Sequence, residues 1–504
     1  MVSSQYDAFL SDPCGFLQKL QNDVFANQNT PNFHTDFNIP QLIKNILQSE
    51  QDWNKIPSLQ KYQRKLQDGQ LVQLECMVQD TNFGHEFYVG AVKNTHDEWK
   101  SCRYSFLEED NESERVEKLE TALDERYSIY VTSIPGQEET YLQPISAEHS
   151  LKLDSSSAYQ NRIFHSESIG AIVKCYGGVE TEIHVCDALR IVGLYESPSE
   201  YTDDLPVVHM LYFENISNLP LRRLSPLENK TMREQTLAFM TRKLGDPIAA
   251  ETLLLTLFGN VFNRTGGSAI GCMSLNLTNC NTIDVANVVS TLKQVCPRVY
   301  QETVSIERLN SVRFYPSSDG ESLSTGVLQV SPGTVLVLDE TQLNKGILND
   351  TGVRNIAFLE QLITEQMLPF MFPFSQFEVP TNLRIVILSQ TKSLLPSQVL
   401  YKYKKPIDDK EHSSSSSEPL EDGLIPAVFD YISQATLVTR IPDDVSKHIQ
   451  DAFVQSRREG KAADEKTLGL QINASCLMAK SWGRNEVSYE DFDFVCDLFE
   501  HWSL

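Results

Sequence analysis

The residues best suited to chemistry are two adjacent acids, Asp339 and Glu340, which follow an apolar run at residues 334–338. Nucleotide-hydrolysing α/β proteins use such a strand end, where one acid holds magnesium and the other polarises the attacking water. Apolar strands also end in ordinary acidic turns. The pair therefore indicates a nucleotide site only where a phosphate-binding turn accompanies it.

No phosphate-binding turn stands at the expected place. Such a turn needs glycines, a lysine and a hydroxyl, and the pattern G-x-x-x-x-G-K-[ST] occurs nowhere in the sequence. The turn after the predicted strand at residues 273–277 reads TNCNTID, without glycine or lysine, and its Asp284 would repel a triphosphate. We therefore expect Asp339 and Glu340 to be a degenerate strand end in a protein that is not an enzyme and needs no cofactor.

Composition disfavours several other classes of function. The ten cysteines form no C-x-x-C pair and the ten histidines no ligand-spaced cluster, so we expect no metal site and no disulfide framework. The net charge of −25 opposes binding to nucleic acid and favours basic protein surfaces as partners. We also expect no membrane association, because the sequence has neither a signal peptide nor a run of about 20 apolar residues.

The first part of the chain predicts helices followed by a β-domain. Residues 1–67 carry helical spacing at 9–20 and 39–47, with Asn38 as a cap for the second helix. Residues 68–195 predict an OB-like barrel, interrupted by an acidic, helical or mobile insertion at about 108–125. The predicted strands are residues 71–78, 86–92, 127–131, 171–176, 182–185 and 190–194.

Charge argues against the usual ligand of such a barrel. Residues 69–195 contain ten Lys or Arg against 22 Asp or Glu, whereas grooves for single-stranded nucleic acid combine cations with aromatic side chains. A protein-binding or structural barrel is favoured, and single-stranded DNA binding stays as an alternative hypothesis.

The second part predicts an α/β core and a helical lid, so the expected fold class is α+β with several domains. Residues 196–226 read as a connector around one strand at 207–212, and residues 227–405 alternate between strands and helices. Residues 406–423 predict a disordered Ser-rich acidic loop, and residues 424–504 a helical lid. The predicted strands of the core are 273–277, 298–306, 334–338 and 383–388, and its helices include 248–258, 283–295 and 353–367. Candidate phosphosites, weighed against a plain linker, are Ser413, Ser414, Ser415, Ser416 and Ser417.

The core resembles the AAA+ core of MCM helicase subunits over much of residues 244–390. The resemblance rests on LGDPIAA at 244–250, LSTGVL at 323–328 before VLVLDE at 335–340, and NLRIVIL at 382–388. The departures fall on the chemistry of the family. The phosphate turn is absent, Ser389 and Gln390 stand near the sensor asparagine, and LLPS at 394–397 offers no arginine finger.

The whole chain resembles the MCM-binding protein family. Further anchors are MVQD at 77–80 with EFYVG at 86–90, IPGQE at 134–138, and GVRN at 352–355. The resemblance implies a nuclear adaptor, with a cytoplasmic pool left open, that binds MCM subunits and regulates their assembly or unloading. It also implies links to replication, genome maintenance and sister-chromatid cohesion. The alternative hypothesis is an AAA+ ATPase with an unorthodox phosphate loop, and the apolar run at 368–374 is either core or a partner-facing loop.

Overall fold

The chain has an α+β fold with N-terminal helices, β-sheets and C-terminal helices, which confirms the expected class. It divides into two compact units: residues 1–134, 145–217 and 321–325 form the first, and residues 135–144, 218–320 and 326–504 the second. The computed structural model describes residues 9–26, 37–62, 66–93, 98–104, 120–137, 169–199, 202, 204–217, 224–318, 323–404, 420, 423–436, 439–458 and 464–502.

Short amphipathic helices open the first unit. In α3, Ile39, Ile43 and Ile46 recur at helical spacing and are buried, as the sequence predicts. Asn38 stands at the N-cap, but it is left-handed (φ 56°) and its side chain makes no capping hydrogen bond. The helices are α2 (Pro13–Ala26), α3 (Ile39–Ile46), α4 (Glu50–Trp53) and α5 (Leu59–Tyr62).

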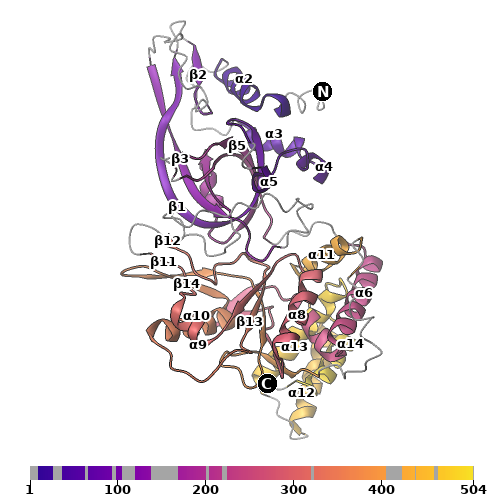
Figure 1. Ribbon diagram of the computed structural model, residues 1–504. Helices are drawn as coiled ribbons and strands as arrows, with labels where there is room; N and C mark the ends of the chain where they lie inside the picture. Colours follow the sequence, from indigo (N-terminus) through magenta and orange to yellow (C-terminus); the bar gives the residue numbers. More distant parts are fainter. Residues whose placement is uncertain are drawn as a thin grey trace. The chain divides into compact units, whose positions relative to one another are not determined.

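Six strands form the sheet of the first unit, in the order β2-β1-β3-β4-β6-β5, and β5 also pairs with β1. The pairings are antiparallel except for β4 with β6, which run parallel. In Figure 1, β1 and β3 are long, curved strands. The strands are β1 (Leu71–Lys93), β2 (Trp99–Ser101), β3 (Glu120–Thr132), β4 (Gly170–Tyr176), β5 (Ala188–Glu196) and β6 (Val207–Asn215).

Alternation along β1 gives this sheet two apolar faces. Val72, Leu74 and Cys76 point into a core between the strands, whereas Leu71 packs with the N-terminal helices. Both faces are covered in this part of the sheet, so strand β5 is apolar and buried along almost its whole length. The strand predicted within the connector, residues 207–212, lies in β6 and belongs to the same sheet.

Three predictions for this unit need correction. The strands at 71–78 and 86–92 are one strand, β1, whose register shifts let it bend without ending. Residues 182–185 are not a strand: 3-10 helix η6 (Val179–Glu182) leads into a turn in which the His184 N–H donates to Asp187 Oδ2 (2.9 Å). Residues 120–125 of the predicted acidic insertion belong to β3, where pairing with β1 overrides their charge; residues 105–119 lie outside the described residues.

The second unit is built on a five-stranded parallel sheet in the order β10-β13-β16-β9-β17. The strands predicted at 273–277, 334–338 and 383–388 are confirmed within one or two residues. The strand predicted at 298–306 is shorter, because Ser305 caps helix α9. The sheet contains β9 (Leu275–Thr278), β10 (Val299–Thr303), β13 (Val335–Asp339), β16 (Arg384–Leu388) and β17 (Val399–Lys402).

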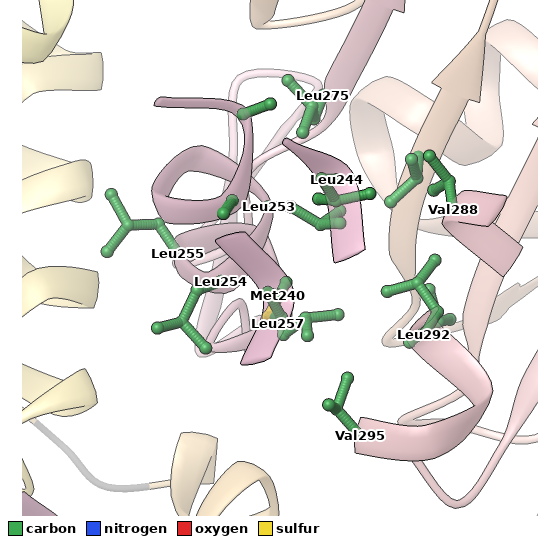
Figure 2. Close-up of a cluster of buried hydrophobic side chains, with 14 of the residues drawn as sticks. Met240, Leu244, Leu253, Leu254, Leu255, Leu257, Leu275, Val288, Leu292 and Val295 are labelled. Carbon is green, nitrogen blue, oxygen red and sulfur yellow. The ribbon is translucent and has the colours of Figure 1, made fainter. Parts of the chain in front are cut away.

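Helices cover this sheet and form its core, part of which Figure 2 shows. Helix α7 is buried all round, because its leucines pack both against the sheet and against neighbouring helices. The Asp246 carboxylate caps α7 and also accepts a hydrogen bond from the Tyr401 hydroxyl of β17 (2.9 Å). The helices are α6 (Pro226–Leu244), α7 (Pro247–Leu257), α8 (Thr282–Val295), α9 (Ile306–Ser311), α10 (Asp350–Glu365), α11 (Ile425–Ser433), η8 (Gln434–Thr436), α12 (Asp443–Arg458), α13 (Glu465–Ser481) and α14 (Tyr489–Phe499).

The remaining strands are short and include a hairpin after helix α10. The helix predicted at 353–367 ends at Glu365, because Gln366 turns left-handed (φ 54°) and Met367 begins the hairpin of β14 and β15. In the part of the chain that the structure describes, no helix combines the length and the apolar character needed to cross a membrane. The remaining strands are β7 (Asn263–Thr265), β8 (Ser268–Ile270), β11 (Ser317–Ser318), β12 (Leu323–Ser324), β14 (Met367–Met371) and β15 (Gln376–Pro380).

Candidate functional site

The strand order places a switch point between β9 and β16, because the chain leaves β9 for β10 toward one side of the sheet and leaves β16 for β17 toward the other. Ligands of open parallel sheets bind beyond the carboxyl ends of the strands at such a point. The turn after β9 meets the end of β16 there: the Asn279 N–H donates to the Gln390 carbonyl (3.2 Å) and the Cys280 N–H to the Ser389 carbonyl (3.0 Å). The residues that the sequence singled out are therefore brought to one edge of the sheet.

In the turn after β9, backbone N–H groups donate hydrogen bonds to side chains of the same turn. The Asn281 side chain accepts from the N–H groups of Ile283 (2.9 Å) and Asp284 (3.0 Å), and the Asp284 carboxylate accepts from the Asn281 N–H (2.8 Å). This reciprocal capping box occupies the donors with which a helix N-terminus would hold a phosphate. The Asp284 carboxylate also places an acid in the same turn.

Asp339 is buried and is held by its own turn. Its Oδ1 accepts hydrogen bonds from the N–H (2.9 Å) and the hydroxyl (2.6 Å) of Thr341. A carboxylate engaged in this way stabilises the strand end, which is the ordinary structural role of an acid in a turn. A magnesium ligand would have to face open space instead.

Glu340 is also buried, and it is directed at the loop that follows β16. Its Oε1 accepts from the Leu394 N–H (3.3 Å). Burial raises the pKa of Glu340, although hydrogen bonds from Ser393 and from the backbone of Leu394 and Leu395 act to lower it. The other oxygen, Oε2, is buried without a hydrogen-bond partner. Glu340 is only 3% exposed, so its side chain lies inside the protein.

Ser389 and Gln390, which follow β16, also make hydrogen bonds within the protein. The Ser389 hydroxyl donates to Asn276 Oδ1 (3.0 Å), and the Gln390 amide donates to the Thr341 carbonyl (2.8 Å). These bonds tie β9, β13 and β16 together at their ends. The polar side chains at this edge therefore hold the sheet together.

Sequence reasoning missed three residues that define this edge: Asn281, Thr341 and Ser393. The spacing of Asn281 and Asp284 matches a capping box, and that signal was available in the sequence. Thr341 lies two residues after Asp339, so its contact with that carboxylate is local as well, whereas the contacts of Ser393 with Glu340 depend on how the loop after β16 folds back. The candidate phosphosites Ser413–Ser417 lie outside the described residues, and within those residues no group of three His, Cys, Asp or Glu side chains could hold a metal ion.

A groove of about 700 Å³ lies between helix α10 and the loop at 392–396. Ser393, Leu394 and Leu395 link this groove to Glu340, since they line the groove and also contact the Glu340 carboxyl group. The remaining lining residues are Ala357, Glu360, Gln361, Thr364, Glu365, Lys392 and Pro396.

Comparison with known proteins gives the family. A family model described as mini-chromosome maintenance replisome factor matches residues 43–162 and 202–501. The UPF0616 protein of Schizosaccharomyces pombe is 40% identical over 510 residues, which cover 100% of both chains.

The relatives whose names state a binding partner have a lower sequence identity to this chain. The mini-chromosome maintenance complex-binding protein of Danio rerio is 32% identical over 317 residues, 56% of this chain and 49% of that protein. Its namesake in Gallus gallus is 25% identical over 616 residues, 94% of this chain and 95% of that protein. The family model alone spans most of the chain, and the resemblance to MCM-binding proteins drawn from the sequence is confirmed. The chain therefore belongs to the mini-chromosome maintenance replisome factor family.

Proposed function

We propose that this protein is a nuclear adaptor that binds subunits of the MCM helicase in an alternative complex. In this role it regulates their assembly or unloading during replication, and so supports genome maintenance and sister-chromatid cohesion. The proposal is supported by relatives in animals and a plant that are named mini-chromosome maintenance complex-binding protein.

The observation that carries the proposal is the capped turn after β9. The parallel sheet and its covering helices are kept, yet Asn281 and Asp284 occupy the amides that a nucleotide would need. A fold that is retained without its chemistry is suited to association, because the surfaces that contact neighbouring subunits do not depend on turnover. We infer that the second unit is an AAA+-like pseudo-ATPase core that occupies or imitates the position of one MCM subunit next to the others.

We also propose that the β-sheet of the first unit is an OB-like barrel. Support comes from the pairing of β5 back to β1 and from the parallel pair of β4 and β6 within an otherwise antiparallel sheet. Its acidic composition favours a basic protein surface over nucleic acid as the partner.

Binding to purified MCM subunits tests the proposal. The full-length protein is mixed with each subunit, and with the subunits together, and the products are separated by size-exclusion chromatography. We expect co-elution with at least one subunit, because a stable interface of about 1,200 Å² or more does not require a working nucleotide site. Failure to co-elute with any subunit contradicts the proposal.

A titration with Mg-ATP separates the adaptor from the ATPase hypothesis. We expect no saturable heat in calorimetry, for the wild type and for Asp339→Asn alike. Saturable binding that Asp339→Asn abolishes would favour the nucleotide-binding alternative instead.

A further inference from the structure

The second unit exposes aromatic side chains on a hairpin. Strands β14 and β15 pair antiparallel, and residues 372–375 form the tip. Phe374 is fully exposed and Phe377 is 59% exposed, while the ring of Phe372 packs edge-on against Phe377 with centroids 5.4 Å apart. Leu368 and Phe370 are buried, so the apolar run is core at its beginning and surface at its end. Adjoining exposed aromatics usually mark a surface that another molecule covers.

The hairpin adjoins the groove along α10. Gln361 lines the groove and donates a hydrogen bond to Glu378 Oε1 of β15 (2.8 Å). The groove wall opposite α10 is the loop at 392–396, on which Leu394 is half-exposed. The hydrogen bond from Gln361 to Glu378 places the hairpin beside the groove, and the two together are here named the hairpin–groove surface. It consists of Glu360, Gln361, Glu365, Phe374, Phe377, Glu378, Lys392 and Leu394.

The charge of this surface selects among its ligands. The hairpin–groove surface contains three acids, Glu360, Glu365 and Glu378, and one basic residue, Lys392. Residues 367–380, which make up the hairpin, contain no Lys or Arg. Phosphate backbones and anionic lipids are repelled by such a surface, whereas a polypeptide with Lys or Arg beside an apolar side chain is attracted to it.

We propose that the hairpin–groove surface is the docking site for a helicase subunit, through a polypeptide segment that carries an apolar side chain flanked by Lys or Arg. This inference rests on the proposed function and specifies its contact surface. The exposed aromatics at the tip enter apolar pockets of the partner. Glu360 and Glu365 pair with the basic residues of the segment that lies along α10.

Binding of full-length variants to purified MCM subunits, measured by bio-layer interferometry, tests the inference. Phe374→Ser with Phe377→Ser removes the aromatic anchors, and we expect the affinity to fall roughly tenfold or more. Glu360→Lys with Glu365→Lys reverses the acidic wall. We expect slower association and a weaker dependence on salt between about 50 and about 300 mM.

A matched control replaces apolar residues that are equally exposed on other elements of the same unit: Leu227→Ser on α6 with Ile283→Ser on α8. Circular dichroism melting of every variant checks that the fold is intact, which is expected because the changed side chains are exposed. The control should bind like the wild type.

The outcomes separate the two proposals. If the wild type binds a subunit and both test variants bind it equally well, the docking site is wrong and the proposed function stands. If the wild type binds no subunit, the proposed function is contradicted, and the docking site that rests on it is contradicted too. If the aromatic variant changes only self-association of this chain, measured by light scattering, the surface joins copies of the protein and the docking of a subunit is refuted.

Discussion

Asp339 and Glu340 lie where the sequence predicts, at the end of a buried strand, and their environments separate them. Asp339 accepts two hydrogen bonds from Thr341, whereas Glu340 keeps one oxygen without a partner and has a raised pKa because of burial. Two adjacent acids at one strand end thus have different environments, which are set by the turn at Thr341 for Asp339 and by the loop at 393–395 for Glu340.

A buried ion pair in the second unit gives the first prediction at this scale. Arg233 of α6 pairs with Glu251 of α7, donates to the Ser481 hydroxyl (2.9 Å) and lies over the ring of Trp482 (4.3 Å). Arg233→Ala leaves the Glu251 carboxylate buried without its cation. We expect the free energy of unfolding to fall by roughly 3 kcal/mol, measured by urea denaturation.

Lys230→Ala is the control for this change. Lys230 lies on the same helix, but its pair with Glu234 is solvent-exposed on both sides, so a loss below about 0.5 kcal/mol is expected. Equal effects of the two substitutions would contradict a structural role for the Arg233 pair.

His209 gives a pH-dependent prediction. The neutral ring is buried and satisfied on both nitrogens, with Nδ1 accepting from the Tyr176 hydroxyl (2.6 Å) and Nε2–H donating to Glu196 (2.8 Å). Burial lowers the pKa of His209 from 6.5 to about 4. The unfolded chain then binds the extra proton between these values, so stability is lost as the pH falls from about 6.5 to about 4, by roughly 3 kcal/mol at most.

Urea midpoints measured between pH 4.5 and 7 check this prediction. His209→Gln should flatten the slope, because the titrating group is gone, even though the variant is less stable overall. A wild-type slope that survives His209→Gln would assign the pH dependence to other groups.

At the scale of elements, caps decide where helices begin and what their ends can bind. Asn281 and Asp284 close the first turn of α8, as Ser225 and Glu228 close that of α6. Polar residues spaced three apart before an apolar run predict such ends from sequence. Element types in the second unit were predicted well for this reason, and because its parallel strands are short apolar runs.

The cap of α8 gives the third prediction. Asn281→Ala removes the acceptor for the N–H groups of Ile283 and Asp284, and we expect a loss of about 1 kcal/mol in the free energy of unfolding. Ile283→Ala, at an exposed side chain in the same turn, is the control and should change stability by less than about 0.5 kcal/mol. An Asn281→Ala variant as stable as the control would show that the cap contributes little.

At the scale of the whole molecule, charge limits the class of partner. The chain has 43 Lys or Arg against 68 Asp or Glu, and its net charge of −25 opposes binding to a phosphate backbone. We expect no binding of a fluorescent single-stranded oligonucleotide in anisotropy measurements, even at about 50 mM salt and about 10 µM protein. A saturable, salt-sensitive signal would restore the single-strand-binding alternative.

The sequence alone determined the elements that local rules govern. Helical spacing predicted α3 and α8, and apolar runs predicted β13 and β16, because helix periodicity and strand hydrophobicity are properties of neighbouring residues. The prediction that the turn at 278–284 does not bind phosphate likewise rests on a local motif, the lysine and glycines that this turn lacks. The family resemblance followed from several short motifs in the right order.

Only the tertiary structure decided what depends on residues far apart in the chain. Strand β1 continues across the two predicted strands because β3 pairs with it from Met77 to Lys93, over the gap between them, and residues 120–125 are extended by that same pairing. Glu340 meets the loop at 393–395, and the tip of the β14–β15 hairpin stays exposed while its base is buried. Such outcomes follow from packing between distant segments, which single-sequence patterns do not encode.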